Sequence, residues 1–333
     1  MSNLQVTFAC WPYDRTEALK DGIVKPKGID LKFLPSHPGD TFLRMLRDHD
    51  FEGSEMSMSA LVMEKERKDP FVAIPVFTSR TFRHNGLFVS TESGIQEPQD
   101  LIGKKVGLPE YTITSSVWIR GILQHEYDVH PTKVEWYVER SGQGRSHASA
   151  LGFEPPEGVT IRPIPETESQ LTLLANGKID AAYIIQDTRS SICRSSLRDF
   201  MNAPNVHRLF ENYKEVEMDY YRKTRLFPIM HTVVLRRDIY EKNKWAAMSL
   251  YDAFVESKRK FYENMGEWEL FSFPWIRSEL EEQRELMGDD PYPYGLKANR
   301  KVVETICQYA VEQGLTSKMI QPESLFAQST LGT

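Results

Sequence analysis

The sequence is poor in several features that mark whole classes of protein. It has three cysteines in 333 residues, each stands alone, and no CxxC pair occurs, so neither a disulfide framework nor a cysteine zinc site is expected. Its 41 lysines and arginines are outnumbered by 47 aspartates and glutamates, and this net charge of −6 argues against a nucleic-acid-binding surface. No run approaches the roughly 18 apolar residues that a membrane span needs.

Targeting and cofactor motifs are missing as well. The start, MSNLQVTFACWPYDR, has no basic segment followed by a long apolar core, so we expect no signal peptide and a cytoplasmic protein. HEYDVH, His125 to His130, spaces its histidines five apart instead of the four of a zinc helix, and SGQGRSH, Ser141 to His147, lacks the context of a dinucleotide site. These motifs therefore indicate neither a zinc helix nor a dinucleotide site. We expect no nucleic-acid partner and no membrane partner, and leave metal binding and a homo-oligomer open.

What the chain does contain is an alternation of short strands and helices. Alternating apolar residues predict strands at Gln5–Cys10 and Ile29–Leu34, with helical stretches after each, which is typical of an α/β protein built from βαβ units. A length of 333 residues suits two domains. We expect two α/β lobes, residues 1–86 plus 227–333 and residues 87–226, joined by the extended crossings GLFVS and FPIMHTVVL around a central cleft.

Two crossings carry histidine. SRTFRHNG follows the apolar run FVAIPVF and contains Arg80, Arg83 and His84, which could bind a small dianion and transfer a proton. The same residues could equally form a solvated loop. PIMH places His231 on the second crossing, where a buried histidine with a satisfied hydrogen bond is the commoner explanation.

Further candidates stand at expected strand ends and helix starts. GSEMSMS offers Glu55 and Ser57, and YTITSS offers Thr114 and Ser115, whose helix N-terminus could bind a carboxylate or simply be capped.

Two more residues are weaker candidates. Arg120 lies one to two turns into the helix after YTITSS and could face either the cleft or solvent. Tyr292, in the loop YPYG, could form the wall of an aromatic site or a packed surface turn.

An ordered series of blocks resembles one family. GSEMSMS, IPVFTSRTFRH, GLPEYTITSSVWIRGIL, LANGKIDA, FPIMHTVV and DPYPYGLKANR together resemble the 4,5-dihydroxyphthalate decarboxylase family and cover most of the chain. The resemblance implies a type II periplasmic-binding-protein-like fold and the loss of CO2 from a hydroxylated aromatic dicarboxylate without a cofactor. It also implies Arg80, Arg83, His84, His231 and Glu55 as residues of the cleft.

This resemblance suggests a mechanism, with alternatives. A ring hydroxyl para to the departing carboxylate feeds electrons into the ring, and either His84 or His231 protonates the ring carbon. The other histidine or Glu55 binds the hydroxyl, while Arg80 and Arg83 anchor the carboxylates. A soluble receptor for an aromatic acid would use the same cleft. A metal-assisted decarboxylase would use Glu55, His84 and His231 as ligands, and an enzyme acting on a pyridine or pyrimidine is a third alternative.

Overall fold

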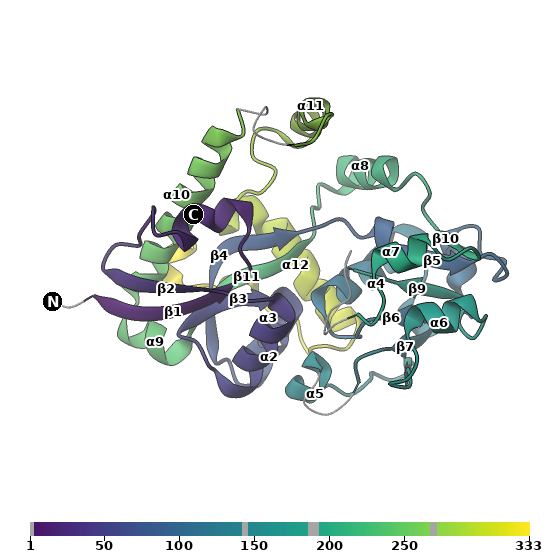
Figure 1. Cartoon of the computed structure of the whole chain (residues 1–333). Helices are drawn as coiled ribbons and strands as arrows, with labels where there is room; N and C mark the ends of the chain where they lie inside the picture. Colours follow the sequence, from purple (N-terminus) through teal and green to yellow (C-terminus); the bar gives the residue numbers. More distant parts are fainter. Residues whose placement is uncertain (1–2, 142–145, 186–192, 267–271) are drawn as a thin grey trace.

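Two β-sheets, each covered by helices, lie side by side in the molecule (Figure 1). The computed structural model describes residues 3–141, 146–185, 193–266 and 272–333. We call the part with the five-stranded sheet lobe 1 and the part with the six-stranded sheet lobe 2. The α/β class is confirmed, while the residue boundaries of the two lobes stay a prediction.

The sheet of lobe 1 places strands from distant parts of the chain next to one another. From edge to edge its strands are β2 (Ile29–Pro35), β1 (Leu4–Cys10), β3 (Gly53–Ser57), β11 (Ile229–Arg236) and β4 (Phe71–Arg80). The first three are parallel, and β11 runs antiparallel between β3 and β4. This return strand brings His231 opposite Ser57 on one side and Ser79 on the other.

The sheet of lobe 2 contains shorter strands. In order they are β10 (Val206–Arg208), β5 (Leu87–Ser90), β9 (Ala181–Tyr183), β6 (Lys105–Leu108), β7 (Glu135–Val138) and β8 (Thr160–Pro163). Within the apolar run IDAAYII, Ile179 to Ile185, only three residues form the strand β9.

Helices cover both sheets. Those of lobe 1 are α1 (Glu17–Lys20), α2 (Pro38–Asp48), α3 (Met58–Arg67), α9 (Arg237–Lys242), α10 (Trp245–Asn264), α11 (Ile276–Met287), α12 (Leu296–Glu312) and α13 (Pro322–Leu325). Those of lobe 2 are α4 (Thr114–Tyr127), α5 (His147–Leu151), α6 (Gln170–Ala175), α7 (Leu197–Met201) and α8 (Tyr213–Thr224). Within the described ranges, no helix has both the length and the apolar character of a membrane span.

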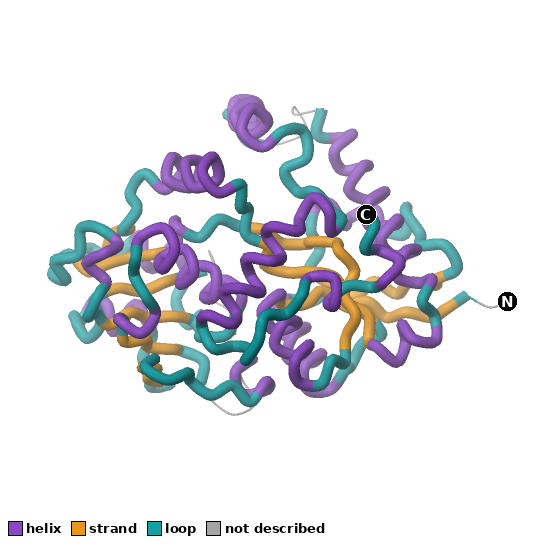
Figure 2. The backbone as a smooth tube through the Cα atoms, turned by 180° about the vertical axis from the view of Figure 1, so that it is seen from behind, coloured by secondary structure: helices purple, strands orange, loops and turns teal. Residues whose placement is uncertain are grey.

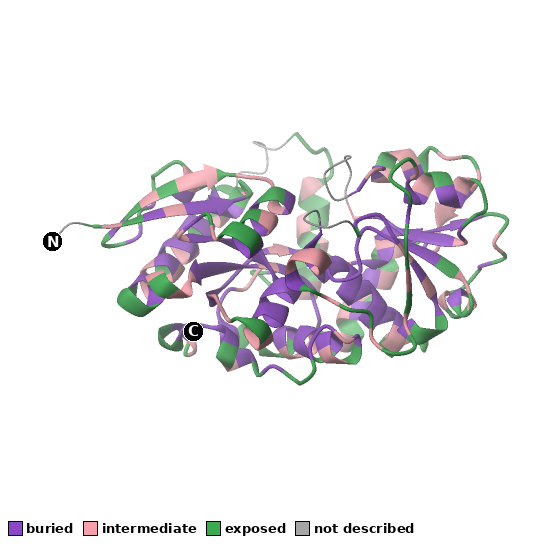
Figure 3. Ribbon diagram, turned by 90° about the horizontal axis from the view of Figure 1, so that it is seen from below, coloured by how far each residue is buried: buried purple, intermediate pink, exposed green. Residues whose placement is uncertain are grey.

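Helices also fill the region between the two sheets, as the view from behind shows (Figure 2). Helix α4 of lobe 2 packs on α12 of lobe 1, and Gly121 is required there because a Cβ atom would overlap the ring of Tyr309. The indole nitrogen of Trp118 donates to the carbonyl oxygen of Ile229 at 2.9 Å. Buried residues therefore continue from one lobe into the other (Figure 3).

Two segments differ from what their sequence pattern indicates. The helical periodicity from Arg237 to Asn264 is typical of one helix, but the segment is divided into α9 and α10 because Asn243 leaves the helical conformation at φ −141° and ψ 56°. The segment from Arg140 to Gly158 has the polar composition of a loop, but it contains α5. Residues 142–145 of that segment, which include both glycines of SGQGRSH, lie outside the described residues.

Candidate active site

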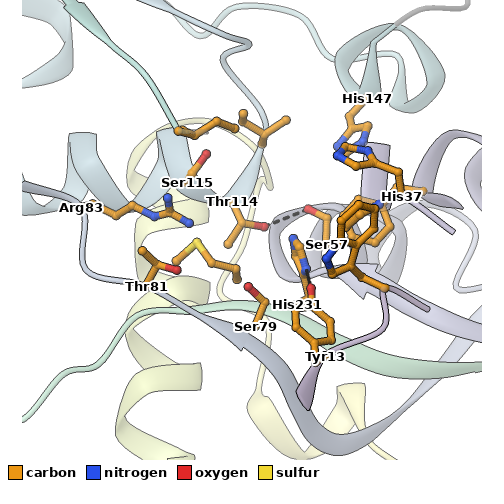
Figure 4. Close-up of a pocket in the computed structure, with 16 residues that line it drawn as sticks. Tyr13, His37, Ser57, Ser79, Thr81, Arg83, Thr114, Ser115, His147 and His231 are labelled. Carbon is orange, nitrogen blue, oxygen red and sulfur yellow. Dashed lines mark hydrogen bonds between the residues drawn. The ribbon is translucent and has the colours of Figure 1, made fainter. Parts of the chain in front are cut away.

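A cavity of about 440 Å³ lies between the two lobes, within the size range of small-molecule sites (Figure 4). Lobe 1 contributes the loops after β1 and β2, the end of β3, and the crossing strands β4 and β11. Lobe 2 contributes the start of α4 and the first residue of α5.

His231 lines the cavity, and a buried carboxylate behind it fixes the orientation of its ring. Its Nδ1 lies 3.1 Å from Oε2 of Glu55, a fully buried carboxylate on the neighbouring strand β3. Val233 pairs with Glu55 across these antiparallel strands, so His231 and Glu55 are diagonal neighbours on one face of the sheet. Because the carboxylate accepts the proton of Nδ1, Nε2 is the nitrogen left for the cavity.

Glu55 is held by further donors. The backbone N–H of Trp11 donates to Oε1 at 2.6 Å, and the hydroxyl groups of Tyr13 and Thr78 donate to Oε2 at 3.1 and 3.4 Å. Burial and the adjacent carboxylate raise the pKa of Tyr13 well above its ordinary value, so its hydroxyl stays protonated and keeps donating. The carboxylate is thereby fixed in the position that orients the ring of His231.

The opposite side of the cavity is suited to an anion. Helix α4 begins at Thr114, and its first N–H groups have no acceptor within the helix, which places partial positive charge beside Ser115. Arg83 enters from the crossing between the lobes and is 8% exposed. Figure 4 shows Arg83 and Ser115 on the side of the cavity away from His37 and His147.

Ser57 connects the two lobes at the base of the cavity. Its hydroxyl lies 2.8 Å from that of Thr114 and 3.4 Å from the backbone N–H of Ala60, which donates to it and thus caps α3. The helix-capping interpretation of Ser57 therefore holds beside its position in the cavity lining.

Two further histidines line the cavity that the sequence analysis had not selected. Nδ1 of His37 accepts from the backbone N–H of Gly39 and caps α2, while its ring packs edge-on against Trp11 at 4.8 Å. His147 is 2% exposed. Burial first, then the charge of Arg140 and the ring of His231, lower the pKa of His147 to about 3, so its ring is neutral. A usable signal for Trp11 and His37 was their position just after the first two strands, at the carboxyl edge of the sheet.

Comparison with known proteins places the chain in a family. A 4,5-dihydroxyphthalate decarboxylase of Comamonas testosteroni is 34% identical over 334 residues, which span 99% of this chain and 98% of that protein. This chain belongs to the 4,5-dihydroxyphthalate decarboxylase family. A second family protein so named, from Pseudomonas putida, is 30% identical over 67% of this chain and 83% of its own length. The family described as "NMT1/THI5 like" matches residues 18–143.

Solved structures confirm the expected periplasmic-binding-protein-like fold. The periplasmic aliphatic sulphonate binding protein SsuA of Escherichia coli superimposes with a TM-score of 0.55 at 11% identity, over 100% of both chains. The desulfurization enzyme DSZB superimposes with a TM-score of 0.50 at 14% identity, over 99% of this chain and 98% of its own. At such identities these likenesses bear on the fold of this decarboxylase-family chain and not on its substrate.

His84 does not reach the cavity that His231 lines. It lies in the short 3₁₀ turn η2 (His84–Gly86), fully buried among Phe210, Tyr220 and Tyr127, with ring centroids 5.2, 5.2 and 6.3 Å away. Neither of its ring nitrogens has a hydrogen-bond partner among the described residues. Burial lowers the pKa of His84 to about 4. The structure thus separates His84 from His231, although the family resemblance implied that both belong to the cleft.

Arg80 also lies outside the cavity lining. It is 4% exposed and donates to the carbonyl oxygens of Phe227 and Pro293, each at 3.1 Å, and to the side chain of Asn299. Its guanidinium group therefore connects β4 to the crossing and to α12 instead of facing the cavity.

Arg120 and Tyr292, like Arg80, bond to other protein groups and not to the cavity. Arg120 is fully buried, stacks on the ring of Tyr111 at 3.5 Å and donates to Gln313 at 3.0 Å. The ring of Tyr292 lies 4.0 Å from the guanidinium of Arg15, and its hydroxyl donates to the carbonyl oxygen of Arg80 at 3.4 Å. Neither residue is among those that line the cavity.

The three ligands of the metal-assisted alternative, Glu55, His84 and His231, do not lie together. His84 lies apart from the cavity beside which Glu55 and His231 meet. In residues 3–141, 146–185, 193–266 and 272–333, no three His, Cys, Asp or Glu side chains are grouped as metal ligands would be.

Proposed function

We propose that this protein converts 4,5-dihydroxyphthalate to 3,4-dihydroxybenzoate and CO2, with His231 as the proton donor. One observation carries the proposal: a histidine held by the buried carboxylate of Glu55 shares a single cavity with Arg83 and the N-terminus of α4. The full-length similarity to a protein named for this activity supports the choice of substrate.

The anion side of the cavity suits the two carboxylates of the substrate. Arg83 offers a permanent charge, and the first N–H groups of α4 favour a negative group. We propose that these groups hold mainly the carboxylate that stays. Tight binding of the departing carboxylate would stabilise the ground state and slow its loss.

The chemistry needs one proton at one ring carbon. The protonated imidazole of His231 gives the proton on Nε2 to the carbon that bears the departing carboxylate, while the hydroxyl para to it supplies electron density. The carbon–carboxylate bond then breaks, its electron pair restores the aromatic ring, and CO2 leaves. The ring of His231 ends neutral and regains a proton from solvent, and Glu55 stabilises the protonated form at the start of each cycle.

The test is turnover by the purified protein. CO2 and 3,4-dihydroxybenzoate should form in equal amounts from 4,5-dihydroxyphthalate, and His231→Gln should reduce the rate by about 10²–10⁴-fold while the substrate still binds. Wild-type binding without CO2 release would instead support a receptor for an aromatic acid, which the fold shared with a sulphonate-binding protein makes the second candidate. Loss of activity after exhaustive chelation would support the metal-assisted alternative. The cytoplasmic location remains a prediction.

A further inference from the structure

His147 is a buried polar side chain without an evident structural role. Both ring nitrogens are inaccessible to solvent, and neither has a hydrogen-bond partner among the described residues. A buried polar group that makes no hydrogen bond costs free energy, and each such group in a folded protein calls for an explanation. An apolar residue would fill the same space without this cost, whereas a ligand group that enters the cavity would give the imidazole a hydrogen-bond partner.

The position of His147 relates it to the reaction site. Helix α5 projects from lobe 2 and packs against α2 and α3 of lobe 1. The ring of His147 lies 5.8 Å from that of Phe42, and the same Phe42 ring lies 4.8 Å from that of His231. The two histidines therefore flank one phenylalanine on the wall of the cavity, and the anion side lies across from His147 (Figure 4).

A buried ion pair holds the start of α5, the helix that begins with His147. The carboxylate of Glu110 is fully buried, accepts the backbone N–H of Ala148 at 2.8 Å, and lies 3.7 Å from the guanidinium of Arg140. Since Ala148 follows His147 in the chain, Glu110 holds the first turn of α5 and with it the backbone that carries the imidazole.

The charge state of His147 limits what it can do. Burial and its positive neighbours lower its pKa to about 3, so near neutral pH the ring carries one N–H donor and one free acceptor nitrogen. Such a ring is too weak a base to take a proton from a phenol, whose pKa is near 10. It is well suited to accept a hydrogen bond from one.

We infer that His147 accepts a hydrogen bond from a ring hydroxyl of the substrate, and that it selects hydroxylated over unhydroxylated aromatic dicarboxylates. This inference rests on the proposed function for the identity of the substrate. A ring whose carboxylates lie at Arg83 and α4 directs its opposite edge, which carries the hydroxyls, toward His147. The bond would also orient the ring so that the carbon to be protonated lies at His231.

The experiment pairs a change in the protein with a change in the ligand. Affinities of 4,5-dihydroxyphthalate and of phthalate, which lacks the hydroxyls, are measured by calorimetry or by competition for wild type, His147→Phe and His147→Gln. For His147→Phe we expect tenfold to hundredfold weaker binding of the hydroxylated ligand and no more than about a twofold change for phthalate. His147→Gln, which keeps an acceptor, should recover part of the loss.

A matched control is His84→Phe, the same substitution at a buried histidine without partners that lies outside the cavity lining. It should leave both affinities unchanged. The thermal midpoint of His147→Phe should not fall, because the variant removes two buried unsatisfied nitrogens. An equal loss of affinity for both ligands, or no loss for either, overturns the inference. The proposed function fails on a separate measurement, when wild type releases no CO2 from 4,5-dihydroxyphthalate.

Discussion

Replacing Glu55 by glutamine tests the role of the carboxylate behind His231. Glutamine has the same shape, and its single oxygen can still accept the backbone N–H of Trp11. Its amide group then faces Nδ1 of His231 at the place where Oε2 now lies 3.1 Å away. An amide N–H₂ cannot accept a hydrogen bond, so the N–H on Nδ1 of the protonated ring loses its charged partner and keeps only the hydroxyl oxygen of Tyr13, which lies 3.2 Å from Nδ1.

The size of the effect follows from the bond that is lost. A hydrogen bond between two charged groups is worth about 1.5–3 kcal/mol, and each 1.36 kcal/mol is a factor of ten in rate. We therefore expect kcat to fall by about tenfold to 150-fold. This remains within the roughly 10²–10⁴-fold that general acid catalysis contributes as a whole.

Steady-state decarboxylation, measured together with the Kd of the substrate, separates chemistry from binding. Because Glu55 lies behind His231 and is not itself among the residues lining the cavity, Kd should change by less than about threefold. Thr78→Val is the matched control, since Thr78 donates to the same carboxylate oxygen, but at 3.4 Å, and its loss should change kcat by only a few-fold. An unchanged kcat in Glu55→Gln, or a loss that appears only in Kd, would refute the assignment.

Three further outcomes test other parts of the structure. Arg83→Gln should weaken the binding of 4,5-dihydroxyphthalate and phthalate alike by about tenfold to hundredfold in calorimetry, because both ligands carry the anchored carboxylates. Burial lowers the pKa of His84 from 6.5 to about 4, so between these values the unfolded chain binds a proton that the native protein does not, and stability falls on acidification. The free energy of unfolding, measured with urea at pH 7 and pH 4, should therefore fall less in His84→Phe than in wild type, by up to about 3 kcal/mol. An equal fall in wild type and in His84→Phe would contradict this. Gly121→Ala should destabilise the contact between α4 and α12 by about 1–3 kcal/mol, whereas Gly332→Ala, where a Cβ meets no atom within 4 Å, should be neutral in the same unfolding assay.

The alternation of side chains along a strand explains why one arginine near the first crossing lines the cavity and the other does not. The apolar run FVAIPVF lies within β4, and Arg83 in the segment after it lines the cavity. Successive side chains of a strand point to opposite faces, so Ser79 lines the cavity while Arg80 points to Asn299. Without knowing which face of β4 meets the cleft, the sequence could not separate Arg83, which lines the cavity, from Arg80, which does not.

His147 was out of reach for a different reason. It stands in a Gly- and Ser-rich segment, and a helix as short as α5 leaves too little periodicity to detect. Its place in the cavity depends on packing against α2 and α3, about 80 to 110 residues earlier in the chain. No local pattern encodes a contact of that kind. His231, in contrast, could be selected because it lies on a strand that had to cross between the lobes.

Glu55 also bears on the choice between an enzyme and a receptor. A receptor for an aromatic dicarboxylate needs cations and N–H groups, which Arg83 and α4 supply. It gains nothing from a second, buried anion in contact with the cavity histidine, because removing a carboxylate from water is costly and its charge repels the ligand. A proton donor does gain, since the carboxylate stabilises the protonated imidazole that the reaction consumes. The pair formed by Glu55 and His231 is therefore the feature that favours decarboxylation over binding alone.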